Sequence, residues 1–328
     1  MFPDLLTGLA AGAACGVAVR SLFEIRRWRA VLDPFTAGHV FALPFAMGVL
    51  TGLTANLSGG LSWELAAGMP IATIAIYAAC ILTFKWQRLL SVLLNLPVFL
   101  GMALLGGLAA LGTARLNISP AITAVVAAVV PVLMTALESR GRRRRRIVRV
   151  ATSLDIDAPP EVIWERIVRV EPIPLREWGA YRLFALLGFP TPQRAELDFD
   201  GLDGLRLGIF SDRVLFEEPV AVWEPGRRVA FDIHVNAEAV NAMPFDGFTR
   251  IGGEYIELRR AEYVLEKLAE GRTRLHLNSV QCVTTRLNGY AAWWGRMILR
   301  AFQRNILALV KERCEQAANQ SVQCKSAI

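Results

Sequence analysis

Histidine and cysteine are scarce in this sequence, whose 328 residues include three histidines and five cysteines. The cysteines are odd in number and form no CxxC pair, so neither a disulfide framework nor a zinc site is indicated. No phosphate-binding glycine loop and no Ser/His/Asp set stands out. The sequence therefore predicts free thiols in a reducing compartment, no metal ion and no cofactor. No catalytic residue can be named, which leans against an enzyme without excluding one.

Acidic residues are nearly missing from the first part of the chain. Through Arg146 there are 13 Lys and Arg against 5 Asp and Glu, and after it 23 against 24. The basic excess thus belongs to the first part, and the second part has almost no net charge. A nucleic-acid-binding domain carries a basic surface of its own, so we expect no nucleic-acid partner.

Five stretches are apolar enough to cross a bilayer, which requires about 20 residues per helix. The first stretch is the weakest, because it is rich in Gly and Ala and contains Arg20, so four spans are the alternative. Residues 1–139 are predicted to form an all-α transmembrane domain. The five stretches are Leu5–Phe23, Phe35–Leu57, Leu65–Phe84, Leu89–Thr113 and Pro120–Leu137.

Positive charges alternate between the loops that join these stretches. Three arginines follow the first stretch, two basic residues follow the third, and a run of arginines follows the fifth. The positive-inside rule then places the N-terminus outside and the second part of the chain in the cytoplasm. Residues 140–148 are predicted to be a juxtamembrane linker that contacts an anionic membrane surface. Its arginines are Arg140, Arg142, Arg143, Arg144, Arg145 and Arg146.

Ionisable and strongly polar residues are few inside the predicted spans. Asp4, Glu64 and Glu138 lie at span ends, which leaves His39 and the polar Asn95 besides Arg20 near the end of the first stretch. Such groups usually mark an ion or proton pathway, so their scarcity disfavours one. His39 lies near the start of its stretch and is expected at the interface rather than as a ligand. A transporter or a membrane assembly partner remains a further alternative.

The pattern changes from Arg149 onward to an alternation of period two, which predicts a strand over Val150–Ile156. A short helix begins at Pro159-Pro160. After an irregular passage over Glu171–Pro192, five further strands are predicted, and Ala269–Arg272 form a hairpin loop between the last two. These strands are Leu205–Ser211, Val214–Trp223, Val229–Val235, Glu254–Leu268 and Thr273–Val283.

One long helix over Leu287–Gln316 ends this second part. Its apolar residues fall on one face and its basic residues on the other, so it is amphipathic and not a sixth span. Strands followed by such a helix predict an α+β domain at residues 149–316, in which a curved antiparallel sheet wraps around the helix and leaves a cavity. Residues 317–328 form a polar tail. The predicted apolar face comprises Tyr290, Trp294, Met297, Ile298, Ala301, Phe302 and Leu309.

Three motifs follow one another along the second part of the chain. They are Ile156-Asp157-Ala158-Pro159-Pro160-Glu161-Val162-Ile163-Trp164, then Val220 with Trp223-Glu224-Pro225-Gly226-Arg227-Arg228, then Gly271-Arg272-Thr273-Arg274-Leu275. These motifs resemble successive signatures of the START-like, polyketide cyclase/dehydrase superfamily, which implies an α+β helix-grip domain at residues 149–316. Asn288-Gly289-Tyr290-Ala291 with Trp294, and Val310-Lys311 with Arg313 and Glu315, are similar to bacterial membrane-anchored members. The resemblance covers about Arg149 to Glu315. It implies a cavity that holds lipids, sterols, polyketides or plant hormones, and a bacterial inner membrane location.

Strand alternation predicts which side chains face this cavity. Candidate ligand-binding residues are Phe231, Ile233, Tyr263, Leu277, Ser279, Gln281, Trp294 and Ile298. Ser279 and Gln281 either orient a ligand or meet backbone and water near the cavity mouth. His234 and His276 have the opposite parity and are expected to face outward.

Two functions are the leading hypotheses for this sequence. The first is a membrane-anchored cytoplasmic module that binds a hydrophobic small molecule, such as a lipid, an isoprenoid or a polyketide-like compound. The second is an enzyme of the cyclase or dehydratase type that acts on a membrane-soluble substrate.

Overall fold

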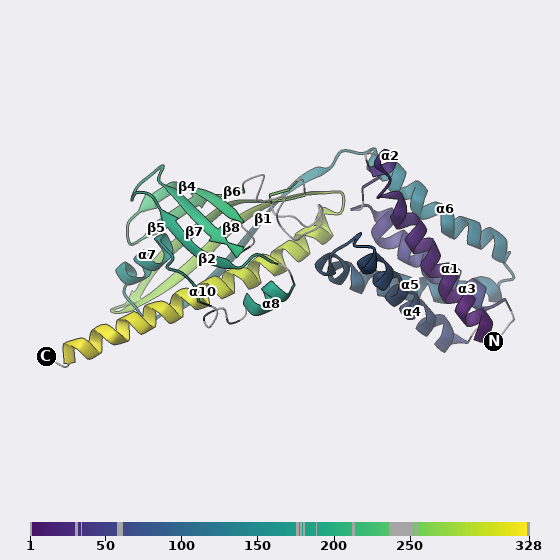
Figure 1. Cartoon of the computed structure of the whole chain (residues 1–328), viewed down its shortest axis with the longest axis horizontal. Coiled ribbons are helices and arrows are strands. Elements are labelled where there is room, and N and C mark those ends of the chain that lie inside the picture. The colour runs from purple at the N-terminus through teal and green to yellow at the C-terminus, as the bar shows by residue number, and fades with distance from the viewer. Residues whose placement is uncertain are drawn as a thin grey trace. The chain divides into compact units, whose positions relative to one another are not determined.

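The computed structural model describes residues 2–29, 32–33, 35–57, 62–174, 177, 179, 181–187, 189–211, 214–235, 252–253 and 255–326. The chain divides into two compact units (Figure 1). The helical unit comprises Met1–Arg144 together with Thr285–Leu287, and the sheet unit comprises Arg145–Thr284 and Asn288–Ile328.

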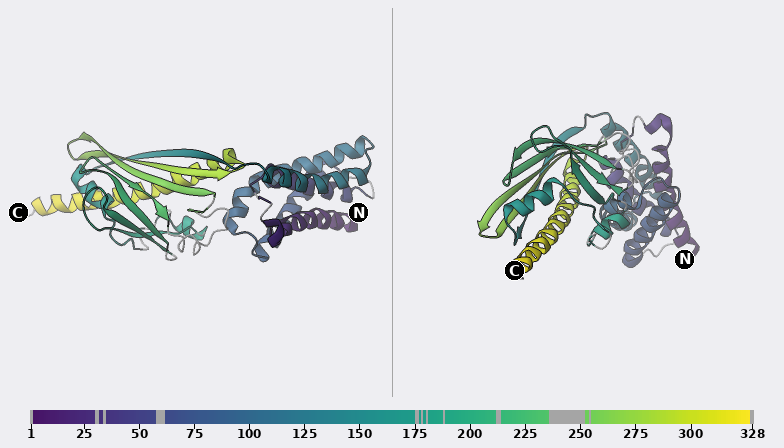
Figure 2. Two further views of the ribbon diagram at one scale, coloured as in Figure 1. Left: turned by 90° about the horizontal axis from the view of Figure 1, so that it is seen from above. Right: turned by 60° about the vertical axis from the view of Figure 1, so that its left-hand side comes forward.

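Five helical segments of the helical unit are long and apolar enough to cross a membrane (Figure 2). They are Pro3–Leu22, Gly38–Ala55, Trp63–Thr83, Leu89–Arg115 and Pro120–Ser139. The predicted stretches are thereby confirmed as helices, while their insertion into a bilayer stays a prediction. The elements are α1 (Phe2–Leu22), α2 (Arg26–Arg29), the π-helical turn η1 (Gly38–Ala42), α3 (Leu43–Ala55), α4 (Trp63–Thr83), α5 (Leu89–Arg115) and α6 (Pro120–Ser139).

Glycines allow α3 and α5 to pack with their backbones in close contact. A Cβ atom on Gly48 of α3 would lie 2.0 Å from the carbonyl oxygen of Ala103, and one on Gly106 of α5 would lie 2.0 Å from that of Phe45. No side chain fits at such distances. Small residues at helix contacts are typical of membrane bundles, in which close packing replaces the hydrophobic effect.

Helix α6 presents an apolar surface that the rest of the described unit leaves uncovered. Ile122, Val125, Leu133 and Leu137 are each more than half exposed. A continuous apolar face of this kind is unfavourable in water and is typical of a surface that contacts lipid or a partner.

Arg20 and His39 are among the ionisable side chains that are buried inside the helical unit. Arg20 is 2% exposed, and it donates hydrogen bonds to Glu24 at 2.8 Å and to the carbonyl oxygen of Trp86 at 2.5 Å. His39 lies in η1, with its ring 4.9 Å from the ring of Phe23. The sequence suggested an interfacial position for His39, but the packing of α1 against the start of the second segment encloses it.

The sheet unit contains one eight-stranded sheet with α10 along it (Figure 1). The strand order is β1-β8-β7-β5-β4-β3-β2, with β6 paired to β4, and every pair of strands whose register is described is antiparallel. The strands are β1 (Arg144–Ile156), β2 (Pro192–Leu197), β3 (Leu205–Phe210), β4 (Leu215–Glu224), β5 (Arg228–Asp232), β6 (His234–Val235), β7 (Ile256–Ala269) and β8 (Arg272–Thr285). The described helices are α7 (Pro160–Val168), α8 (Tyr181–Leu186) and α10 (Asn288–Ser326).

The strands agree with the predicted ones except at three places. The predicted strand Val229–Val235 is divided at Ile233 into β5 and β6. Strand β1 begins at Arg144 rather than near Val150. The sequence did not reveal this earlier start, because the first residues of the strand are exposed arginines that show no apolar alternation. Strand β2 follows the passage that was expected to be irregular, and no strand was predicted there. The predicted hairpin between β7 and β8 is confirmed, and Gly271 supplies the positive φ, 69°, that its two-residue turn requires.

Helix α10 buries a stripe that overlaps the predicted one only in part, since Leu309 is buried as expected. Met297, expected on the inner face, is 48% exposed, whereas Ala292, Gln303, Leu307, Val310 and Cys314 are buried. A prediction from the spacing of apolar residues could not place the polar side chain of Gln303 on the buried face of the helix. Its amide nitrogen donates to the carbonyl oxygen of Val150 at 3.1 Å and to Ser279 Oγ at 2.8 Å, which removes the cost of burying it.

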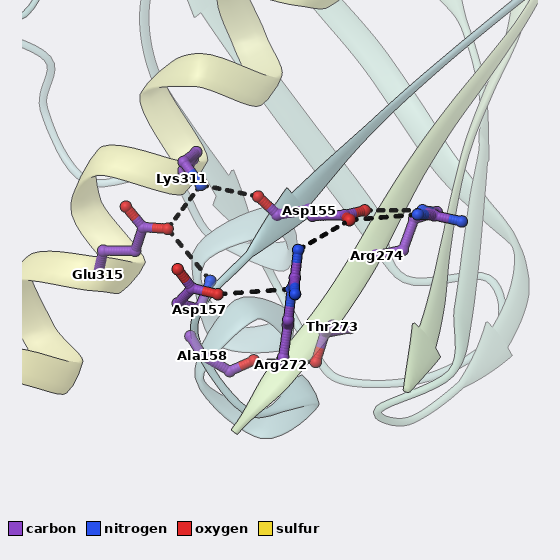
Figure 3. A network of polar contacts seen from close by, with 8 residues as sticks. All are labelled: Asp155, Asp157, Ala158, Arg272, Thr273, Arg274, Lys311 and Glu315. Carbon is purple, nitrogen blue, oxygen red and sulfur yellow. Dashed lines mark hydrogen bonds and ion pairs between the residues drawn. The ribbon is translucent and has the colours of Figure 1, made fainter. Parts of the chain in front are cut away.

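A polar network joins α10 to the ends of β1 and β8 (Figure 3). Lys311 Nζ donates to the carbonyl oxygen of Asp155 at 2.8 Å and pairs with Glu315 at 2.7 Å. Glu315 in turn accepts a hydrogen bond from the backbone N–H of Asp157 at 3.1 Å. The Asp155 carboxylate accepts from Arg274 at 2.7 Å and 3.1 Å. These contacts fix the helix at this end of the sheet.

We expect this network to make stability depend on pH in the acid range. The hydrogen bond from Arg274 lowers the pKa of Asp155 below its ordinary value of 3.8. A carboxyl group with a lowered folded-state pKa stabilises the protein above its ordinary pKa, and this contribution disappears as the pH falls through the folded-state value. The thermal midpoint of Asp155→Asn should therefore lie below that of the wild type at neutral pH, and the gap should close below pH 3.8.

The variant Asp157→Asn is the matched control. Its carboxylate is 72% exposed and lies 3.6 Å from Arg272, so its effect should be smaller at every pH. Tryptophan fluorescence of the full chain in detergent gives both midpoints. A gap between Asp155→Asn and the wild type that stays constant down to the acid limit would contradict the assignment.

Candidate ligand-binding cavity

A cavity of about 120 Å³ lies between the sheet and α10 within the sheet unit. Its walls come from α7, α8, β2, β3, β4, β7, β8 and α10, and apolar side chains dominate them. The volume is close to the ~150 Å³ of an engineered protein cavity that binds benzene. The enclosed space therefore suits a group about the size of one ring.

Four of the eight predicted ligand-binding residues line this cavity. They are Ile233, Tyr263, Leu277 and Ser279. Strand alternation placed them correctly on the face that α10 covers, since successive side chains of a strand point to opposite faces.

The other four predicted residues lie away from the cavity wall. Phe231 is fully buried in the apolar core, and the Arg206 guanidinium lies 4.7 Å from its ring centre. Gln281 is buried further along β8, near Gly295 of α10. Trp294 and Ile298 belong to the part of α10 where the stripe is rotated, and Leu299 lines the cavity there instead. The cavity occupies only a part of the sheet face that α10 covers, and the alternation of side chains along a strand cannot show which part.

The sequence interpretation missed a charged pair in the cavity wall. Arg206 of β3 and Glu218 of β4 are direct cross-strand partners, and their side chains form an ion pair in which each is 9% exposed. Arg206 Nε also donates to the carbonyl oxygen of Val168 at 3.1 Å. Burial raises the pKa of Glu218, and Arg206 opposes that rise. The register of the β3–β4 pair would have revealed the ion pair, because residues directly opposite each other share a face.

Two tyrosines add hydroxyl groups to the same wall. Burial raises the pKa of both Tyr181 and Tyr263, so both are neutral phenols at neutral pH. The Tyr181 hydroxyl is buried and has no hydrogen-bond partner among the described residues. The Tyr181 ring packs edge-on against Phe302 of α10, with the ring centres 5.6 Å apart. Helix α8 thereby covers one side of the cavity.

Ser279 is the third hydroxyl in the wall. Its oxygen accepts a hydrogen bond from Gln303 Nε2 at 2.8 Å, and Gln303 Oε1 accepts one from Thr152 at 2.8 Å. No hydrogen bond donated by Ser279 is seen among the described residues, so its proton can serve another acceptor.

The remaining reactive groups of the sheet unit lie elsewhere. His276 pairs with Glu266 at 3.1 Å on the outer face of the β7–β8 hairpin, and His234 is exposed, as their parity predicted. No cluster of metal-binding side chains occurs among the described residues. The cavity thus presents apolar walls, one ion pair and hydroxyl donors, which is an arrangement suited to binding.

Comparisons with known proteins find only solved structures of low similarity. The sequence matches no protein-family profile, and no curated protein matches it. Among solved structures, the Zhui aromatase/cyclase from Streptomyces sp. R1128 is 14% identical, covers 53% of this chain and 96% of its own, and has a TM-score of 0.33. Truncated norcoclaurine synthase from Thalictrum flavum is 7% identical, with coverages of 53% and 95% and a TM-score of 0.32. An uncharacterised protein from Rhizobium leguminosarum is 13% identical, with coverages of 52% and 99% and a TM-score of 0.31. We base no inference about function on similarity at this level.

Proposed function

We propose that this chain is a membrane-anchored module that binds a hydrophobic small molecule in the cavity of its sheet unit. The observation that carries the proposal is the cavity itself. Most proteins fill such spaces with side chains, since interiors pack as densely as organic crystals. A ring-sized apolar space with a few polar groups in its wall is the usual form of a small-molecule site.

The proposed anchoring rests on the helical unit. Its five long apolar helices and the uncovered face of α6 suit a bilayer, and the alternating loop charges favour a cytoplasmic sheet unit. The arginine run supports contact with anionic lipid, since Arg142, Arg145 and Arg146 are exposed. A bacterial inner membrane location follows from the same pattern together with the sequence resemblance.

Binding is favoured over catalysis because the acidic group in the cavity wall is already paired with an arginine. Glu218 is the only acidic residue among the described lining residues, and Arg206 already occupies its carboxylate. A general base must be able to reach a proton of the substrate. The enzyme alternative therefore requires a ligand that first displaces Arg206.

We expect Ala261→Phe to abolish ligand binding. Ala261 of β7 lines the cavity opposite Ser279, and a phenyl ring there would fill a space of about 120 Å³. Bound small molecules should fall at least about tenfold, because a site that cannot admit the ligand loses its packing contacts. Mass spectrometry of compounds extracted from the purified full chain measures the amount.

The matched control is Leu268→Phe, which adds the same ring to an exposed position of the same strand. It should retain the wild-type amount of ligand. Comparison of the two variants separates cavity ligand from lipid bound to the helical unit. Equal amounts in Ala261→Phe and the wild type would refute the proposal.

A further inference from the structure

We propose that the cavity selects a neutral ligand group that carries an oxygen acceptor, such as a phenol, an alcohol or a ketone, and rejects carboxylates and phosphates. This inference rests on the proposed function, because it specifies the ligand of the same cavity. It follows from the charges and hydrogen bonds of the wall.

The positively charged side chains of the cavity wall are already paired with carboxylates of the protein. Each of the three arginines that line the cavity is paired with a carboxylate of the sheet unit. The pairs are Arg206 with Glu218, Arg166 with Glu171 at 2.8 Å, and Arg194 with Glu196 at 2.7 Å. A ligand anion would therefore meet only arginines that already have a carboxylate partner, and it would lose its hydration without gaining a counter-ion of its own.

Of the three arginines, Arg206 is the least available to an anionic ligand. Arg206 donates to Glu218 and to the carbonyl oxygen of Val168, and it lies 4.7 Å from the ring centre of Phe231. Arg166 and Arg194 are 31% and 49% exposed, so solvent screens their attraction for an anion. No described lining group thus offers the buried, unpaired positive charge that a carboxylate head needs.

Hydroxyl donors remain for a neutral acceptor. Tyr181 is one of the lining residues, and its hydroxyl is buried and has no partner among the described residues. A buried hydroxyl without a partner is unfavourable, and a ligand oxygen would satisfy it. Ser279 lies in the same wall with its oxygen already accepting from Gln303, so it too can donate. Two donors, aromatic side chains and arginines that are each already paired match a ring that bears a hydroxyl or carbonyl oxygen.

Isothermal titration of the full chain in nanodiscs tests this selectivity, with empty nanodiscs subtracted. The probes are ethylbenzene, 4-ethylphenol and 4-ethylbenzoate, which share one ring and differ only in the polar group. The wild type should bind the phenol about tenfold or more tighter than either other probe, the effect of one good hydrogen bond or one unpaired charge.

Two variants separate the polar groups of the wall. Tyr181→Phe should lower phenol affinity about five- to tenfold and leave ethylbenzene unchanged, because it removes one hydroxyl and keeps the ring. Glu218→Gln should raise benzoate affinity at least about tenfold, since it frees the charge of Arg206 while the amide can still accept its hydrogen bond. Tyr181→Phe keeps the test decisive if Glu218→Gln does not fold.

Failure of this inference is distinct from failure of the proposed function. Equal or tighter binding of benzoate, or no gain of phenol over ethylbenzene, would overturn the selectivity and leave the cavity as a binding site. An unchanged phenol affinity in Tyr181→Phe would also overturn it. Binding of none of the three probes would refute both the selectivity and the proposed function.

Discussion

Replacing Glu218 with leucine should lower the free energy of unfolding by about 3–5 kcal/mol. The substitution leaves the Arg206 guanidinium, whose side chain is 9% exposed, without its carboxylate. A buried charge that loses its partner keeps the full cost of its desolvation, which is larger than the value of the ion pair itself. Urea unfolding of the full chain in detergent measures the change.

The double variant Arg206→Met with Glu218→Leu is the informative control. It removes both charges, so it should recover most of the stability that the single variant loses. Glu262→Ala removes the carboxylate of a partly exposed pair, in which Arg228 is 43% and Glu262 20% exposed, and should cost about 1 kcal/mol or less. A double variant no more stable than Glu218→Leu would show that lost packing, and not charge, causes the effect.

Replacing Asp33 with alanine should destabilise the helical unit by about 3 kcal/mol. Its side chain is 3% exposed and lies between two cations, 2.9 Å from Arg143 Nε and 3.2 Å from Arg286 Nε. It also accepts the backbone N–H of Phe35 at 2.9 Å. The arginines come from distant parts of the chain, so the carboxylate joins the segment after α2 to the segment after β8. Thermal unfolding in detergent, monitored by the circular dichroism signal of the helices, measures this loss of stability.

Asp33→Asn separates charge from hydrogen bonding at this position. The amide oxygen can still accept the N–H of Phe35, so this variant should lose less than Asp33→Ala. In a double-mutant cycle, Arg286→Met should cost clearly less in the Asp33→Ala background than in the wild type. Additive losses would mean that Asp33 acts independently of Arg286.

The sequence alone predicted those features that depend on local pattern. Runs of apolar residues located all five long helices, because a helix of that length and composition is recognisable without its partners. Alternation located most strands, and Gly271 marked the β7–β8 turn, since few residues other than glycine adopt a positive φ readily. The same alternation placed Tyr263 and Ser279 on the cavity side.

Tertiary structure alone decided which polar groups are inside. Hydrophobic patterns assign charged and amide side chains to the surface, whereas Arg206, Glu218 and Gln303 are buried because each meets a partner from another strand or helix. Those partners are 12 and 24 residues away in the sequence, and only the strand register and the rotation of α10 bring them together. The sequence thus determined that a sheet would enclose a helix, and the packing of that sheet on α10 determined where the cavity lies and what its wall can bind.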